Sequence, residues 1–445
     1  MNNIPAGWVW APVNDLCQFN PKTTAEDDSA CGFVPMQGLG TRYLADTSIE
    51  QRAWGDVKKA YTHFQNGDVL VAKVTPCFEN GKAGIARNLP NGIGAGSSEF
   101  CVFRPHPGID SKYLLGCFST EDFRRRATVA MTGSVGLKRV PKDVFLGEQI
   151  PLAPAAEQTR IADKLDAVLS RVDDVNARLD RVEPLLKRFR QSVLAAGMSG
   201  QLTKDSREDS DSWEQTTVES IADVGTGSTP LRSNPNFFAP QGTAWVTSAA
   251  TGSEKIFSAQ EYVTPAAITA HRLKKYPIGT LLIAMYGEGK TRGQVSELAI
   301  EATINQACAA IVVDDRLMRN DFVKFALKAN YLKMREMAEG GNQPNLNLSK
   351  IKTFSLPKPP LDEQTEIVRR VDILFAFADR LEARLKAART AAQRLTPAVL
   401  AKAFRGELVA QDPADEPAAE LLKRLAAQRP QAPVGARRSR SGARS

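Results

Sequence analysis

The chain repeats itself at a spacing of about two hundred residues. The five residues that begin at Glu157 return at Glu363, 206 positions later, with one difference among them. The same shift carries Gly200 onto Gly406 without a gap. A repeat of this length contains a whole domain, so it predicts two equivalent structural units related by a pseudo-two-fold axis.

Each copy contains a long stretch in which apolar residues recur at alternating steps of four and three. The first stretch runs from Ile161 to Val193 and the second from Ile367 to Val399. This spacing is typical of a coiled-coil seam, so the sequence predicts two long helices that pack on each other in an antiparallel arrangement. The seam residues are Ile161, Leu165, Val168, Val172, Val175 and Leu179 in the first helix, and Ile367, Val371, Leu374, Leu381 and Leu385 in the second.

The repeat and the helices divide the chain into six segments. These are globular regions at 1–150 and 213–355, helical regions at 151–202 and 356–410, a polar linker at 203–212, and a flexible Ala-, Pro- and Arg-rich tail at 411–445. Both globular regions alternate short apolar strands with turn residues and short amphipathic helices. The predicted fold class is therefore α+β, with two mixed α/β domains separated by two long antiparallel coiled-coil helices in a pseudo-two-fold internal repeat.

The composition indicates a soluble protein with a moderate basic excess. The 445 residues carry a formal net charge of +8, which permits nucleic-acid binding without establishing it. The start lacks a secretory signal and no apolar run is long enough to cross a membrane, so we expect a cytoplasmic protein. Six scattered cysteines and only three histidines give no disulfide framework and no metal-ligand spacing.

Two stretches are similar to catalytic motifs but lack a required residue. Gly289-Lys290-Thr291 matches the end of a phosphate-binding loop, but Ala284 stands where the first glycine of that motif belongs. Asn234-Pro235-Asn236-Phe237 is similar to the amide-proline-proline-aromatic motif of adenine methyltransferases, but Asn236 replaces its second proline. The sequence therefore predicts no catalytic site.

Three segments together carry a resemblance to a known family. They are 68–82 (DVLVAKVTPCFENGK), 341–347 (GNQPNLN) and 356–364 (LPKPPLDEQ). With the duplicated architecture, they make the chain, from about Trp8 to Leu408, similar to the specificity (S) subunit of Type I restriction-modification enzymes. The lead before the first helix is less rich in proline than the lead before the second, which is the one departure.

The resemblance implies a subunit without catalysis. It implies two target-recognition domains, each of which reads one half of a bipartite, asymmetric site in double-stranded DNA. It also implies that the helices set the unread spacer and bind methyltransferase (M) subunits, expected to number two, and that restriction (R) subunits join for cleavage. S-adenosylmethionine is then expected on the M subunits, so this chain is expected to bind no cofactor and no metal.

Base-reading residues are expected where the two copies diverge, because the two halves of an asymmetric site differ. Arg, Lys, Asn and Gln in divergent loops are the candidates, since these side chains pair with guanine and adenine edges. They are Gln37, Arg42, Lys73, Lys82, Lys138 and Arg139 in the first unit, and Lys290, Arg292, Asn342 and Gln343 in the second. The alternative for each is a contact with phosphate or with water only.

Two other functions remain open at this point. A single-chain DNA methyltransferase, or the specificity module of a related restriction system, would share the DNA-reading domains, but the incomplete motifs disfavour the former. A coiled-coil assembly scaffold without a DNA role would share the helices, but the paired globular regions disfavour it. Two protected patches in a DNA footprint, obtained with the M subunit present, would separate DNA reading from scaffolding.

Overall fold

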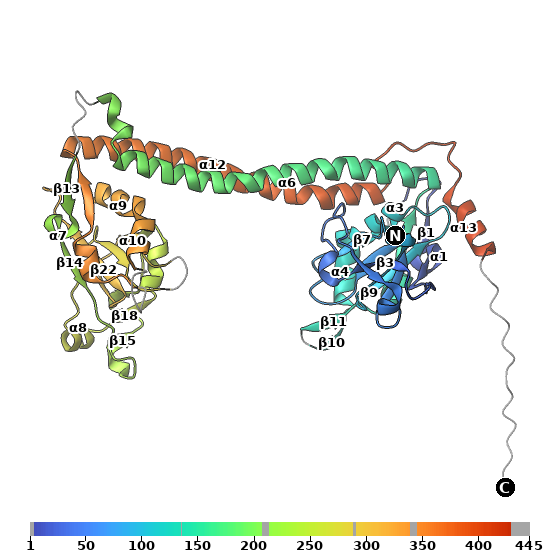
Figure 1. Cartoon of the computed structure of the whole chain (residues 1–445), viewed down its shortest axis with the longest axis horizontal. Helices are drawn as coiled ribbons and strands as arrows, with labels where there is room; N and C mark the ends of the chain where they lie inside the picture. Colours follow the sequence, from blue (N-terminus) through green and yellow to red (C-terminus); the bar gives the residue numbers. More distant parts are fainter. Residues whose placement is uncertain (1–3, 135, 207–212, 288–290, 339–344, 429–445) are drawn as a thin grey trace, which may run out of the picture. The chain divides into compact units, whose positions relative to one another are not determined.

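The computed structural model describes residues 4–134, 136–206, 213–287, 291–338 and 345–428 (Figure 1). The chain divides into two compact units, Met1–Leu179 with Ala387–Ser445 and Asp180–Lys386, called the first and the second unit below. Two helices of 44 residues, α6 (Ala155–Met198) and α12 (Leu361–Phe404), contribute to both units. Each ends before a glycine, Gly200 or Gly406, with a φ of +74°, the left-handed conformation that terminates helices.

The first unit is built on two four-stranded sheets. The first has the order β2 (Cys17–Phe19), β9 (Phe100–Pro105), β6 (Val69–Ala72) and β7 (Ala83–Ile85). The second has the order β4 (Glu50–Ala53), β3 (Ala30–Val34), β8 (Ile93–Gly96) and β5 (Thr62–Gln65). All neighbours are antiparallel except β3 and β8, which run parallel.

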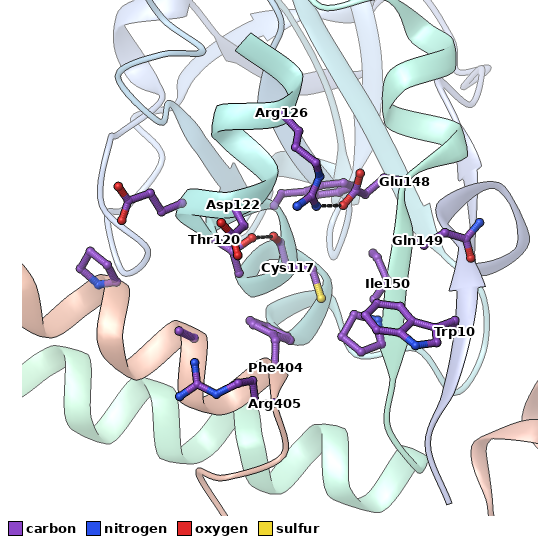
Figure 2. Close-up of a pocket in the computed structure, with 15 residues that line it drawn as sticks. Trp10, Cys117, Thr120, Asp122, Arg126, Glu148, Gln149, Ile150, Phe404 and Arg405 are labelled. Atoms are coloured by element: carbon purple, nitrogen blue, oxygen red, sulfur yellow. Dashed lines mark hydrogen bonds and ion pairs between the residues drawn. The ribbon is translucent and has the colours of Figure 1, made fainter. Parts of the chain in front are cut away.

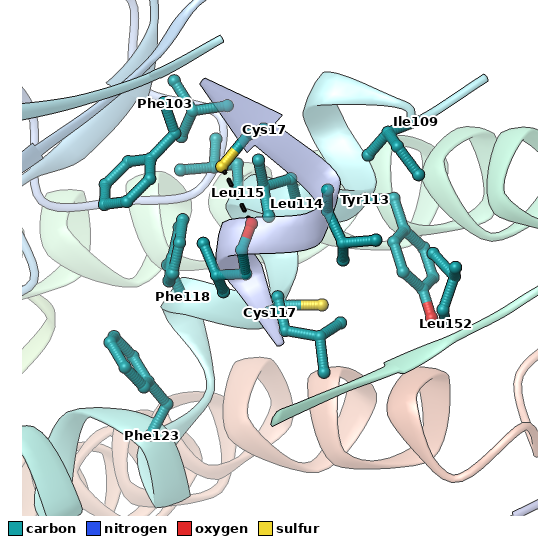
Figure 3. Packing of buried hydrophobic residues seen from close by; sticks show 14 of the residues in the cluster. Cys17, Phe103, Ile109, Tyr113, Leu114, Leu115, Cys117, Phe118, Phe123 and Leu152 are labelled. Atoms are coloured by element: carbon teal, nitrogen blue, oxygen red, sulfur yellow. Dashed lines mark hydrogen bonds between the residues drawn. The ribbon is translucent and has the colours of Figure 1, made fainter. Parts of the chain in front are cut away.

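Short strand pairs and helices complete the first unit. The pairs are β1 (Val9–Pro12) with β12 (Gln149–Leu152) and β10 (Thr132–Ser134) with β11 (Leu137–Arg139). The helices are α1 (Val13–Leu16), α2 (Trp54–Val57), α3 (Ser111–Ser119), α4 (Glu121–Val129), α5 (Lys142–Gly147) and α13 (Ala418–Ala427), with 3-10 turns η1 (Met36–Gly38) and η2 (Pro90–Gly92). Phe103 of β9 and Phe118 of α3 face each other in the main core, at ring centroids 4.7 Å apart (Figure 3).

The second unit repeats this plan with a wider sheet. Its sheets have the orders β14 (Ala222–Thr226), β22 (Cys308–Val313), β19 (Leu281–Ala284), β20 (Val295–Leu298), β17 (Lys255–Ile256), and β15 (Phe238–Ala239), β18 (Glu261–Val263), β16 (Thr243–Val246), β21 (Ala302–Ile304). Its other elements are the pair β13 (Glu214–Thr217) with β23 (Ser355–Lys358), helices α7 (Val218–Ile221), α8 (Pro265–His271), α9 (Asn320–Ala329), α10 (Tyr331–Ala338) and α11 (Leu348–Lys352), and turns η3 (Gln201–Ser206), η4 (Pro235–Phe237) and η5 (Ser248–Gly252).

The long helices run antiparallel within each unit. In the second unit, Arg190 of α6 pairs with Asp379 and Glu382 of α12, while Gly197 of α6 lies against Ile367. Later residues of α6 thus meet earlier residues of α12. The predicted fold class is confirmed: each unit mixes sheets with helices, the element order repeats, and the two long helices are antiparallel.

Burial along the two helices follows the predicted seam only in part. The seam residues that are buried are Ile161, Leu165, Val172, Ile367, Val371 and Leu385, and those that are half-buried are Val168, Leu179, Leu374 and Leu381. Val175 departs from the prediction because it is 43% exposed, whereas Leu169, outside the predicted seam, is buried. The start of α6 also packs on the globular part of its unit, where Leu165 lies against Gly116 of α3, so a step of four residues replaces the heptad there.

The segment expected to form a flexible tail from residue 411 is ordered as far as residue 428. Helix α13 packs against α1, and its Leu421 and Leu425 are buried in the main core of the first unit. The segment before it is held by an ion pair between Arg160 and Asp415 at 2.6 Å. Residues 429–445 lie outside the described part of the chain.

Candidate nucleic-acid interface

The first turns of α6 and α12 make matching contacts in their own units. The indole N–H of Trp8 donates to Glu157 at 2.9 Å, and the indole N–H of Trp213 donates to Glu363 at 3.0 Å. Burial raises the pKa of Glu157, and the hydrogen bond from Trp8 partly offsets that effect. These two pairs tie the start of each globular region to the start of a long helix.

The glutamine that follows each of these glutamates is fully buried and uses both ends of its amide. Gln158 accepts from the backbone N–H of Asp110 at 3.0 Å and donates to the Ala153 carbonyl at 2.9 Å. Gln364 accepts from the backbone N–H of Arg319 and donates to the Pro359 carbonyl, both at 2.8 Å. The twice-repeated Glu-Gln pair therefore belongs to the scaffold that the two units share.

Several predicted DNA-binding residues of the first unit meet where β6 ends. Lys73 follows β6 directly, and its ammonium donates to the Ser98 carbonyl at 2.9 Å. The backbone of Lys73 donates to Glu99 and accepts from Val140, which brings β11 alongside. Lys82 is joined to the same place, because its carbonyl accepts from Ala72, the last residue of β6. We call the residues at this end of the strand, Lys73, Lys82, Lys138 and Arg139, the β6 edge.

Arg139 and Lys138, both on β11, differ in whether their side chains are held by hydrogen bonds. The guanidinium of Arg139 makes two hydrogen bonds to the Glu99 carboxylate, at 2.9 and 2.7 Å, and holds the pKa of Glu99 below its usual range. Lys138 is exposed and pairs with no acidic side chain in the described part of the chain. Glu99 was not anticipated from the sequence, since it lies forty residues from its partner and no local pattern marks it.

The remaining candidates of the first unit are placed differently. The ammonium of Lys82 donates to the Met36 carbonyl at 2.8 Å, and Gln37, next to Met36 on η1, is exposed. Arg42 does not belong to the β6 edge, because it pairs at 3.3 Å with Asp173 of α6. The structure thus brings Lys73, Lys82, Lys138 and Arg139 together at the β6 edge, leaves Gln37 exposed beside Met36, and directs Arg42 to the helix.

The second unit has an equivalent edge where β19 ends, with different side chains. The backbone of Met285 donates to Ala307 at 2.8 Å and accepts from Leu346 at 3.2 Å, which is the pattern that Lys73 makes in the first unit. Met285 therefore stands where the first unit has Lys73. Arg292 follows in the next loop, with a buried Nε that has no hydrogen-bond partner among the described residues. Lys290, Asn342 and Gln343 lie outside the described residues.

The first unit also contains a cavity of about 310 Å³, between the end of α3, the start of α4, β12 and the last turn of α12 (Figure 2). Arg126 and Glu148 form an ion pair in it, and Thr120 donates to the Cys117 carbonyl at 2.8 Å. Burial holds the pKa of the Cys117 thiol well above its usual value, so this cysteine is a packing residue rather than a nucleophile.

Two searches of the described residues returned no candidates. No group of three or more His, Cys, Asp or Glu side chains is arranged to hold a metal ion within the ranges that the structure describes. In the same ranges, no helix combines the length and the apolar character that crossing a membrane requires. All six cysteines are free thiols.

Comparison with known proteins places these features in a family. The model of the Type I restriction modification DNA specificity domain matches residues 5–183 and again residues 210–388. The StySPI specificity subunit of Salmonella potsdam is 29% identical over 456 residues, which cover 96% of each chain. The EcoAI specificity subunit of Escherichia coli is 42% identical over 174 residues, and this match spans 30% of its length and 39% of the present chain.

A solved structure shares the fold. A chain from a study titled as the structural basis of complex assembly and conformational transition of the type I R-M system superposes with a TM-score of 0.76. The superposition covers 92% of this chain and all of the other, at 20% sequence identity. Because the family model covers most of the sequence in two matching copies, the chain belongs to the family of proteins with the Type I restriction modification DNA specificity domain.

Proposed function

We propose that this chain is the non-catalytic DNA-specificity subunit of a Type I restriction-modification complex. Each globular region reads one half of a bipartite, asymmetric site in double-stranded DNA. The observation that carries this proposal is a contrast between the two units: their backbone hydrogen bonds match at the ends of β6 and β19, but the side chains there differ. The same backbone hydrogen bonds surround Lys73 in the first unit and Met285 in the second, but the side chains differ in charge and chemistry.

A shared frame with unlike side chains suits the recognition of two different sequences. Base edges are distinguished by side-chain donors and acceptors, whereas the backbone frame only positions them. At the β6 edge, the cations Lys73, Lys82 and Arg139 are held by hydrogen bonds, and Lys138 extends freely. Held cations attract phosphates without choosing bases, so we assign Lys73 and Lys82 to contacts with the DNA backbone.

We assign the unread spacer of the site to α6 and α12, since each helix has residues in both units. Inserting one heptad into each helix should then lengthen the spacer and leave the bases of both half-sites unchanged. We propose that the recognition and spacer roles follow the domain boundaries expected from the sequence, with one change. These boundaries are 1–150, 151–202, 203–212, 213–355, 356–410 and 411–445. Residues 411–428 belong with the first recognition domain, because α13 packs in its core.

We further propose that two M subunits dock on the long helices, one for each unit. Large apolar side chains on these helices are exposed in both units: Val175 (43%) and Leu395 (46%) in the first, and Leu185 (54%), Ile373 (54%) and Phe377 (47%) in the second. Exposed apolar patches of this kind mark surfaces for protein partners. R subunits then join this assembly, and S-adenosylmethionine binds to the M subunits. Because the proposed ligand is DNA, we propose that the complex acts in the cytoplasm.

The test is to prepare this chain with its M subunits, supply S-adenosylmethionine, and map the methylated adenines on random-sequence DNA. The expected motif has two short specified parts with an unspecified spacer, and the M subunits without this chain should methylate no defined motif. Methyl transfer by the chain alone would contradict the proposal and favour a single-chain methyltransferase. Assembly with the M subunits without any DNA footprint would instead favour a scaffold.

A further inference from the structure

The strand pair formed by β10 and β11 is unusually exposed for a β structure. We call it the β10–β11 ribbon. The three residues of β10 are all exposed, and on β11 Leu137 is 49% exposed and Lys138 is exposed. The pair forms a sheet of its own, and Figure 1 shows it projecting from the first unit on the side away from α3. Only Arg139, at the base of the ribbon, is half-buried.

An isolated hairpin is only marginally stable in water, so its base must hold it. Both ends of the ribbon run into the core, through Met131 (8% exposed) and Val140 (2% exposed). The backbone N–H of Thr75 donates to the Lys138 carbonyl at 2.9 Å, and the Arg139 side chain is fixed by its two bonds to Glu99. The ribbon is therefore anchored firmly at one end and open to solvent along its length.

The two faces of the ribbon carry different side chains. The register pairs Thr132 with Arg139, Gly133 with Lys138, and Ser134 with Leu137. Residues directly opposite one another share a face, so Lys138 shares its face only with Gly133, which has no side chain. A Cβ at Gly133 would lie 2.5 Å from the Leu137 carbonyl oxygen, and its φ is +133°, so a glycine is required there. Lys138 thus stands without a side-chain neighbour across the ribbon.

We propose that the β10–β11 ribbon enters the DNA major groove and that Lys138 reads a guanine in the half-site of the first unit. The major groove is about 12 Å wide and admits a two-stranded ribbon, and a lysine ammonium donates to the O6 and N7 acceptors of guanine. The opposite face carries two hydroxyls, the Leu137 side chain and Arg139, and it points away from the bases when the Lys138 face lies on them. This inference rests on the proposed function, since it names the reading element of one recognition domain.

Arg139 has a separate role in this arrangement. Its guanidinium is committed to Glu99, so it positions the ribbon and does not touch the bases. Replacing Glu99 should therefore alter how firmly the ribbon is held, whereas replacing Lys138 should alter which base is chosen. The two changes differ in their readout: the first lowers the rate at every site, and the second changes the preferred sequence.

The experiment uses the full complex of this chain with its M subunits and random-sequence DNA. The methylation motif is compared for the wild type, Lys138→Ala, Lys138→Arg and the control Lys59→Ala, which changes another exposed lysine of the first unit that lies off the ribbon. For Lys138→Ala, preference for guanine should fall about tenfold or more at one position of one half-site, with the other half-site unchanged. Lys138→Arg should keep the guanine, and Lys59→Ala should leave the motif intact.

An unchanged motif for Lys138→Ala would overturn the inference, because the ribbon would then choose no base. Equal weakening at all sequences, with a smaller dependence on salt, would also overturn it, since that result marks a phosphate contact. Either result, obtained beside a bipartite wild-type motif, would leave the proposed function standing. Absence of a bipartite motif for the wild-type complex would instead overturn the proposed function and the inference together.

Discussion

Two regions of the molecule differ in how similar the two units are. The first turns of α6 and α12 make the same contacts in both units, whereas the ends of β6 and β19 carry different side chains. At the helix starts, the Trp–Glu and glutamine contacts agree to within about 0.2 Å in length. At the edges, a lysine in one copy corresponds to a methionine in the other. The scaffold contacts are thus shared by both units, whereas the side chains at the edges differ, as the proposed reading of two unlike half-sites requires.

The closing segments of the two units differ as well. Glu363 accepts from Thr203, which follows α6, and Glu157 accepts from Gln411, which follows α12. Beyond Gln411 the first unit continues into α13, which covers α1, and the described part of the second unit has no helix at the corresponding place after η3. The first unit therefore depends on the end of the chain for part of its core.

The largest effect should come from removing that end. Truncation after Ala410 removes the buried Leu421 and Leu425, so the first unit should lose about 3–6 kcal/mol of stability. Hydrogen exchange measured by mass spectrometry should show faster exchange in the first unit only. Truncation after Gln428 is the control and should leave both units unchanged. Equal loosening of both units would show that α13 does not belong to the first unit alone.

Replacing the buried glutamine in the first turn of each long helix should have the next largest effect, and the effect should be similar in the two units. Gln158→Leu leaves the Asp110 N–H and the Ala153 carbonyl without partners, which should cost the first unit about 2–4 kcal/mol. Gln364→Leu should cost the second unit a similar amount. Denaturant titration with unit-resolved hydrogen exchange measures both, and the exposed Gln191→Leu on α6 is the control. A large loss in one unit and none in the other would refute the equivalence of the two scaffolds.

A smaller effect concerns charge where each globular region meets its helix. Lys112 pairs with Asp166 in the first unit, but the matching positions in the second hold Asp321 and Asp372. Burial raises the pKa of Asp372, repulsion from Asp321 raises it further, and Lys324 opposes these effects. Ionised Asp372 therefore costs the second unit stability, and this cost is relieved as pH falls through its raised pKa.

Asp321→Asn tests this charge difference. The substitution removes the repulsion from Asp321, so the pKa of Asp372 should fall but stay above its ordinary value, because burial and the charge of Glu254 still raise it. A side-chain carboxyl titration followed by NMR measures the change. An unchanged pKa would show that Asp321 does not act on Asp372.

The smallest effect is expected at Arg42. Its pair with Asp173 is exposed, so Arg42→Ala should change stability by less than about 0.5 kcal/mol. It should also leave the methylation motif unchanged, because Arg42 faces a helix rather than the β6 edge. A changed motif would return Arg42 to the base-reading residues that the sequence suggested.

The sequence predicted long-range organisation better than it predicted local contacts. The apolar steps of four and three were sufficient to locate both helices, because every turn of a helix places an apolar residue on the same face. They predicted that Val175 lies in the seam, but it is 43% exposed, because burial depends on what lies opposite the helix. Leu169 is buried instead, in a core cluster that contains Leu400 of α12 and residues of the globular region. Glu99 could not be found because its role arises only when a distant strand brings Arg139 beside it.

The end of the chain was predicted only in part. The sequence indicated a possible short helix at Ala418 to Ala427, which α13 confirms, but the Ala- and Pro-rich surroundings suggested a flexible tail rather than a packed segment. What orders the segment is a set of contacts far away in sequence, among them the Gly7 carbonyl, which accepts from the Ala418 N–H at 2.9 Å. Tertiary partners of this kind leave no periodic signal.

The most direct test of the central claim is to exchange one recognition domain and read the motif. Residues 9–152, from β1 to β12, would be replaced by the matching segment of another member of the family, in the full complex with M subunits. Methylated adenines mapped on random-sequence DNA should then show a new first half-site, with the second half-site and the spacer retained. A motif in which both halves change, or neither does, would contradict the account that each unit reads its own half.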